Sequence, residues 1–228
     1  LTLVGSVASI AGVGVTVAST AILMQRMSTI DENLRSISDK IEGVPKEIRD
    51  NRISGLLAQI DTQLQRLEEA PFRNSSSGTE ADLRKVEETL HSTFDALQFM
   101  AVRLAKLPLI DAPLLRTLLN GLAVAGAAQI KSLVWLNDLA VAEKRANKQA
   151  IKLFQLSELL PQDILRTRTG ADPDLSAQLG LELADLRATA ATRPTLLESL
   201  QRLEISGPRY LSEMEERDDV PVLVFASG

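Results

Sequence analysis

The first 25 residues of this chain contain no charged side chain, and the first charge is Arg26. As a helix, at about 1.5 Å per residue, this run would extend roughly 36 Å, which is enough to cross a hydrocarbon core of about 30 Å. An apolar segment of this length must be kept from water by lipid or by other protein. The sequence therefore predicts a membrane-competent helix over residues 1–26.

Small residues recur along this run at spacings of three and four. On a helix they would form stripes that allow close packing against another helix within lipid. The candidates for this packing are Gly5, Ala8, Ser9, Gly12, Thr16 and Thr20. The run is also compatible with a permanent anchor, a helix buried in a large soluble core, or a processed signal segment. A signal segment is the least expected of these, because no basic region precedes the apolar residues.

A heptad pattern of apolar residues begins inside the run and continues to Ile48. Such a pattern is typical of a coiled-coil seam, although a helix of an antiparallel bundle shows it too. The predicted assembly seam consists of Met27, Ile30, Leu34, Ile37 and Ile41. Gly43 and Pro45 predict a break near residue 44, after which the pattern resumes from Ile53 to Leu67.

The rest of the chain favours an all-α, elongated helical bundle. Leu, Ala, Val and Ile supply most of the apolar content, aromatic residues make up only 3%, and charged residues 24%, which is typical of long packed helices. Charges of both signs are interspersed and the net charge is −5, so no nucleic-acid surface is predicted. The absence of cysteine excludes disulfides and thiolate metal sites.

Residues 27–160 are predicted to form the long-helix bundle, with a linker at 71–78. A helix beginning near Thr79 has apolar residues on one face from Leu83 to Leu104 and ends before Pro108. Asp111 and Pro113 predict the start of the next helix. No proline follows before Pro161, so one helix of roughly 70 Å is expected there.

This long helix contains a second uncharged stretch, residues 117–130. It is short for a bilayer span, which favours a helix centre buried between neighbours. A sharper alternative is a groove formed by small residues, including Gly121, Ala125 and Gly126, that would shelter the amino-terminal run.

Proline and glycine divide residues 161–228 into short units, with helices predicted over 175–190 and 196–205 and a third after Pro208. Residues 220–225 favour a short β-strand. Acidic residues from Glu213 to Asp219 are expected to be a solvated surface, and this region is a possible site for a protein partner.

Catalytic and metal-binding patterns are nearly absent from the sequence. His91 is the only histidine, which excludes sites built from several histidines. Glu87 lies four residues before it, so a hydrogen bond between the two on a helix surface is expected. No phosphate-binding loop or nucleophile turn is recognised. We therefore predict no cofactor, no metal and no enzymatic activity.

The apolar run joined to long heptad helices resembles the α-helical pore-forming toxins of the cytolysin A and haemolysin BL type. The resemblance covers about residues 1–160 and is architectural, and no functional residue is carried over from it. It implies an apolar part that is shielded in a soluble form and enters lipid when protomers assemble. The chain differs by placing its apolar run at the start instead of between long helices.

The sequence thus predicts a membrane-associated helical protein that forms homo-oligomers, inserts its apolar run into a lipid bilayer and forms a pore or otherwise permeabilises it. Two alternatives remain. One is a coiled-coil scaffold or adaptor, anchored in a membrane or soluble. The other is a helical accessory domain of a larger protein.

Overall fold

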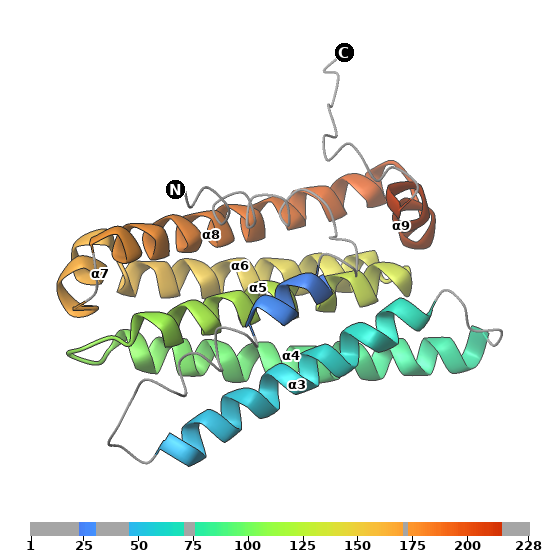
Figure 1. Cartoon of the computed structure of the whole chain (residues 1–228). Helices are drawn as coiled ribbons and strands as arrows, with labels where there is room; N and C mark the ends of the chain where they lie inside the picture. Colours follow the sequence, from blue (N-terminus) through green and yellow to red (C-terminus); the bar gives the residue numbers. More distant parts are fainter. Residues whose placement is uncertain (1–22, 31–45, 71–75, 171–172, 216–228) are drawn as a thin grey trace, which may run out of the picture.

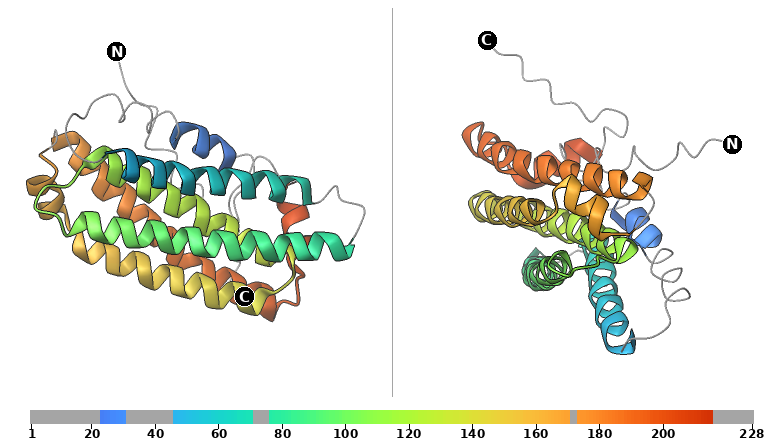
Figure 2. Two further views of the ribbon diagram at one scale, coloured as in Figure 1. Left: turned by 90° about the horizontal axis from the view of Figure 1, so that it is seen from below. Right: turned by 90° about the vertical axis from the view of Figure 1, so that its left-hand side faces the viewer.

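The computed structural model describes residues 23–30, 46–70, 76–170 and 173–215. These residues form eight helices and no strand, which confirms the predicted all-α bundle. Five long helices make up most of it: α3 (Lys46–Glu69), α4 (Ser76–Ala105), α5 (Ala112–Trp135), α6 (Leu139–Leu159) and α8 (Pro173–Arg202). Successive long helices run in opposite directions, so α4 and α6 are parallel (Figure 1). The short helices α7 (Gln162–Arg168) and α9 (Gly207–Glu215) lie at opposite ends of the bundle (Figures 1 and 2).

Helices α3 and α4 use the apolar faces that their sequences predict. In α3 the resumed seam from Ile53 to Leu67 is buried, and in α4 the face from Leu83 to Leu104 is buried. Helix α3 ends at Glu69, two residues after the last apolar residue of the seam, and α4 ends before Pro108 as predicted. Helix α4 begins at Ser76, three residues earlier than predicted, so the predicted linker 71–78 is too long.

Helix α5 is the central element of the bundle. Asp111 accepts a hydrogen bond from the backbone N–H of Leu114 at 3.0 Å and caps the helix, as predicted. The helix contacts α3, α4, α6, α8 and α9. Among the described residues it is the one helix long and apolar enough to span a membrane, but 94% of its apolar window is buried inside the bundle. The stretch 117–130 is therefore a buried helix centre.

The alternative prediction of a groove on α5 for the amino-terminal run is wrong. A side chain at Gly121 would meet Leu57 and Leu97, which belong to α3 and α4. At Gly126 it would meet Phe94, Gln149 and Arg193, from α4, α6 and α8. The small residues of α5 thus allow the chain's own helices to pack closely.

The prediction of one helix from Asp111 to Pro161 is also wrong, because the chain turns between α5 and α6. Asn137 has a φ of 55°, a left-handed conformation that asparagine tolerates better than most residues. Its side-chain Oδ1 accepts a hydrogen bond from the backbone N–H of Gly207 at 2.7 Å. A side chain at Gly207 would lie 2.0 Å from the carbonyl oxygen of Val134, so only glycine fits there. The α5–α6 turn and the start of α9 are therefore joined by this hydrogen bond and by close packing.

Past Pro161, the sequence predicts two short helices where the structure has the single helix α8, with Pro194 inside it. One face of α8 is buried on both sides of this proline, including Leu186, Ala190, Leu197 and Leu200. Continuous packing along α6 outweighs the lost backbone hydrogen bond. The backbone of Gly180 lies against the side chain of Gln162, which allows α7 to approach α8 closely.

The amino-terminal part is described from Leu23 to Ile30, which forms a helical segment. Leu23, Met27 and Ile30 are buried in the core, so the described part of the predicted assembly seam faces the chain's own bundle. The predicted packing residues Gly5, Ala8, Ser9, Gly12, Thr16 and Thr20, the seam residues Leu34, Ile37 and Ile41, and the predicted strand 220–225 lie outside the described residues.

Candidate functional site

The most distinctive feature of the interior is a layer of polar side chains that separates two apolar clusters. The larger cluster includes Ala128 of α5, Leu153 of α6 and Ala190 of α8. The smaller one gathers the end of α5, the start of α6, the end of α8 and α9. Helices α5, α6 and α8 each contribute to both clusters, and each has one polar residue on its buried face between them. These residues are Gln129, Gln149 and Arg193, and all three are buried.

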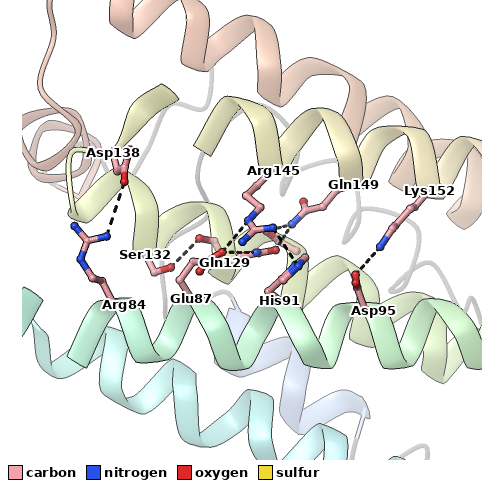
Figure 3. A network of polar contacts seen from close by, with 11 residues as sticks. Arg84, Glu87, His91, Asp95, Gln129, Ser132, Asp138, Arg145, Gln149 and Lys152 are labelled. Atoms are coloured by element: carbon pink, nitrogen blue, oxygen red, sulfur yellow. Dashed lines mark hydrogen bonds and ion pairs between the residues drawn. The ribbon is translucent and has the colours of Figure 1, made fainter. Parts of the chain in front are cut away.

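Directed hydrogen bonds join these side chains across four helices. Arg193 Nη1 donates to Gln149 Oε1 at 3.3 Å, and Gln149 Nε2 donates to Gln129 Oε1 at 2.7 Å. Gln129 Nε2 donates in turn to Glu87 Oε1 at 2.8 Å. Each amide thus accepts on one side and donates on the other, so the bonds polarise one another in the same direction. The chain of bonds leads from a cation on α8 to a carboxylate on α4. Figure 3 shows its part from Gln149 to Glu87.

Glu87 is the acceptor on which this network ends. Its Oε1 also accepts from Arg145 Nε at 3.1 Å, and Arg145 Nη1 lies 3.1 Å from His91 Nε2. Because a guanidinium only donates, this contact requires the His91 tautomer with an unprotonated Nε2. The predicted surface hydrogen bond between Glu87 and His91 is therefore corrected. Glu87 is buried, and Arg145 bridges the two side chains.

Ion pairs extend the contact between α4 and α6 in both directions. Lys152 Nζ lies 2.7 Å from Asp95 Oδ1, and Arg84 Nη1 lies 4.0 Å from Asp138 Oδ2 (Figure 3). Partners further along α4 pair with residues further along α6, as two parallel helices require. These pairs and Glu87–Arg145 form a ladder that fixes the axial register of α4 against α6.

Arg193 is the least compensated charge in the layer. Its side chain is 6% exposed, and its Nη2 has no hydrogen-bond partner among the described residues. Burial lowers the pKa of Arg193 to about 10, so it is still charged at neutral pH. The absence of a side chain at Gly126 leaves room for Arg193 and Gln149 beside α5.

Two carboxylates of α8 face cations on other segments, outside the layer. Glu182 accepts a hydrogen bond from Arg116 Nη2 of α5, and Asp185 faces Arg26 of the amino-terminal segment. Burial raises the pKa of both carboxyl groups above its usual value, and the nearby arginines oppose this shift. Burial also lowers the pKa of Arg26, while Asp185 opposes that shift. Arg26 Nε and Nη2 and Asp185 Oδ2 are buried without a hydrogen-bond partner among the described residues, so the two charges attract each other without a direct bond.

Most polar side chains of the layer are hydrogen-bonded to one another. Glu87 is occupied by Arg145 and Gln129, and the two glutamines are occupied by each other and by Arg193. No group of three or more potential metal ligands occurs among the described residues. The arrangement is suited to fixing helix positions.

Of this layer, only Gln129 stands out in the sequence, as a polar residue within an apolar stretch, and the rest was missed. A usable signal was present, because Gln149 continues the core spacing of Ala142, Ala146 and Leu153 along α6. Arg193 does the same on α8 between Ala190 and Leu197. A polar residue in phase with a buried face indicates a buried polar contact, although not its partner.

Comparison with known proteins gives no relative from which a role could be transferred. No protein-family model, no curated protein and no solved structure matches the chain. The resemblance to α-helical pore-forming toxins therefore stays a prediction.

Proposed function

We propose that this protein is a membrane-attached helical bundle that inserts the part of its apolar run before Leu23 into a lipid bilayer. The proposal rests on the packing of other helices against the small residues of α5. The small-residue face that was the candidate shelter for the run is filled by side chains of α3, α4, α6 and α8. With this shelter closed, the uncharged residues before Leu23 need another apolar environment, and their length suits a bilayer.

The bundle offers a firm attachment for such a segment. Leu23, Met27 and Ile30 are at most 3% exposed, and Asp185 of α8 attracts the Arg26 charge. A force on the inserted run would therefore be transmitted to the core and to α8 instead of to a loose linker.

Association within the membrane is part of the proposal. Gly5, Ala8, Ser9, Gly12, Thr16 and Thr20 would form the packing surface, because small side chains let helices approach closely in lipid. Replacing Gly12 with Leu is expected to impair oligomer formation and any permeabilisation, while helicity stays nearly unchanged. Unaltered assembly and dye release in this variant would reject the role of the small residues.

Flotation with dye-loaded liposomes tests insertion. The full chain is expected to float, and Val13→Arg, near the middle of the run, should abolish flotation because a cation at the centre of a helical span costs about 2.5–3.5 kcal/mol. Leu181→Arg is the matched control, since Leu181 is exposed on α8. Equal flotation of the Val13→Arg chain and its parent would contradict the proposal.

A second candidate is a helical scaffold without a membrane contact. The burial of α5, the one candidate span among the described residues, favours it. The same experiment separates the possibilities. A scaffold stays in the dense fraction, an anchored bundle floats without dye release, and a pore-forming protein floats and releases dye.

We also propose that the protein is not an enzyme. In the polar layer, the acidic and basic groups hold one another in place, and His91 is held by Arg145.

A further inference from the structure

The outer surface of α6 combines exposed apolar side chains with lysines. Val141, Lys144, Lys148, Ile151 and Phe154 follow one another at spacings of three and four, which places them along one side of the helix. Ile151 is 58% exposed and Phe154 is 49% exposed. We call this set the α6 surface. Single exposed apolar residues are ordinary, but these lie together on one helix.

Neighbouring residues on α8 and α4 also combine exposed aromatic rings with basic side chains. Arg187 of α8 lies over the ring of Phe154, 5.9 Å from its centroid. On α4, Phe99 is 56% exposed, and Arg103 lies 5.7 Å from the centroid of its ring. Phe99 follows Asp95 by one helical turn, and Asp95 pairs with Lys152 of α6. Exposed aromatic rings with arginines beside them are typical of protein interfaces.

The charge of this helix contrasts with that of the whole chain. Lys144 and Lys148 are exposed on α6, whereas Arg145 and Lys152 pair with Glu87 and Asp95 of α4. The chain as a whole carries a net charge of −5. Of the two carboxylates on α6, Glu143 accepts a hydrogen bond from Gln201 of α8, and Glu158 lies in the last turn. An acidic partner therefore complements the α6 surface.

The position of α6 decides between a lipid and a protein as that partner. Both views in Figure 2 place the segment 23–30 and α6 on opposite sides of the bundle. If the run before Leu23 enters a bilayer, as proposed above, it leaves the bundle at the segment 23–30, on the side opposite the α6 surface. The α6 surface is then accessible from water to another protein.

We propose that the α6 surface is a docking site for an acidic amphipathic helix of a partner protein. Apolar side chains of that helix, spaced by three and four residues, would contact Ile151, Phe154 and Phe99. Its carboxylates would pair with Lys144 and Lys148. The assignment of a protein partner rests on the proposed function, because that function places the bilayer on the other side.

The test uses the full chain with Val13→Arg, which stays in solution if insertion depends on the run. The probes are synthetic helical peptides with leucines at identical positions and an increasing number of glutamates, and a matched peptide carries lysines instead. Binding is measured by fluorescence anisotropy of the labelled peptides. Affinity is expected to rise with glutamate content and to fall with added salt.

Two variants localise the binding. Ile151→Ser combined with Phe154→Ser is expected to weaken binding of the acidic peptide about tenfold or more, because two apolar contacts are lost. Lys148→Glu should weaken it several-fold and favour the lysine peptide. Leu181→Ser is the control, since Leu181 is 61% exposed on α8 and is not part of the α6 surface. Thermal unfolding midpoints confirm that each variant is folded.

Three results would overturn this assignment. The first is no binding of the acidic peptides, or equal binding by parent and variants. The second is binding of phosphatidylglycerol vesicles through Ile151 and Phe154 without peptide binding, which would identify lipid as the partner. The third is self-association that these substitutions abolish, which would identify a second copy. Failure of the proposed function is seen separately, because the parent and the Val13→Arg chain would then behave alike in flotation.

Discussion

Helix α5 contains two glycines, Gly121 and Gly126, that allow close packing in two different chemical settings. A methyl group at Gly121 would approach Leu97 Cδ1 to 3.1 Å and Leu57 Cδ2 to 3.3 Å, which are ends of flexible aliphatic side chains. At Gly126 it would approach Gln149 Oε1 to 3.1 Å and Arg193 Nη1 to 3.4 Å, within the polar layer. Glycine thus allows close helix packing against apolar side chains at one position and against polar side chains five residues later.

The difference between these crossings concerns how much each can adjust. An aliphatic side chain moves by a few tenths of an ångström at little cost, whereas Gln149 is held by hydrogen bonds to Gln129, Gly126 and Arg193. We therefore expect substitutions at the polar crossing to have large effects of either sign, and those at the apolar crossing to be absorbed.

The largest effect is expected from Glu87→Ala. The change leaves Arg145 and Gln129 without their common acceptor, which should lower the free energy of unfolding by about 2–3 kcal/mol. Urea denaturation measures it. Glu88→Ala, at the exposed neighbouring residue, is the control and should stay within about 0.5 kcal/mol of the parent. A similar small loss for Glu87→Ala would show that the ladder does not hold α4 to α6.

An increase in stability is expected from Arg193→Met. Methionine has a similar length and removes a buried, incompletely paired cation, so the free energy of unfolding should rise by about 1–2 kcal/mol. Arg187→Met, on the exposed side of the same helix, should change it little. A loss of stability on Arg193→Met would mean that the bond to Gln149 outweighs the cost of burying the charge.

The comparison between the glycines themselves is tested by alanine at each position. Alanine favours helix over glycine by about 1 kcal/mol, which applies equally to both sites. Gly121→Ala should be neutral or stabilising, whereas Gly126→Ala should be less stable than Gly121→Ala by about 1 kcal/mol. Thermal and urea unfolding of the pair measure this difference, and equal stabilities would show that the polar layer adjusts as easily as the leucines.

The smallest effect concerns the pH dependence of Glu182, which lies outside the layer. Because burial raises the pKa of Glu182 in the folded state, its ionisation destabilises the fold. The parent should therefore lose stability as the pH rises from the unfolded pKa, near 4.3, through the higher folded pKa. Glu182→Gln should be more stable than the parent at pH 7, by less than about 1 kcal/mol, and the difference should shrink on acidification. A difference that grows at low pH would show that the pairing with Arg116 dominates.

The sequence predicts best those features that depend on neighbouring residues. The apolar faces of α3 and α4, the stop before Pro108 and the Asp111 cap are determined within a few turns, and the structure confirms them. The turn between α5 and α6 was missed, because Asn137 and Asp138 are a weak local signal. Its support comes from Gly207, 70 residues later in the chain.

The single helix α8 and the polar layer were missed for a related reason. Pro194 is a local signal against a helix, but packing along α6 outweighs it, and such packing is not visible in a short window. Likewise, the phase of Gln149 and Arg193 indicates burial, while their pairing joins positions 44 residues apart. Local preference therefore predicts elements well, and the contacts among distant elements decide their ends and polar partners.

The α5–α6 turn has a consequence for which residues are tolerated at position 137. The site requires both a left-handed backbone and a side-chain acceptor for the Gly207 N–H. Glycine adopts the backbone conformation but has no acceptor, and glutamine has an acceptor but does not favour this conformation. Asparagine and aspartate are the side chains that satisfy both at that reach. A single substitution at Asn137 would loosen both the α5–α6 turn and the start of α9. We therefore expect position 137 to tolerate few other residues.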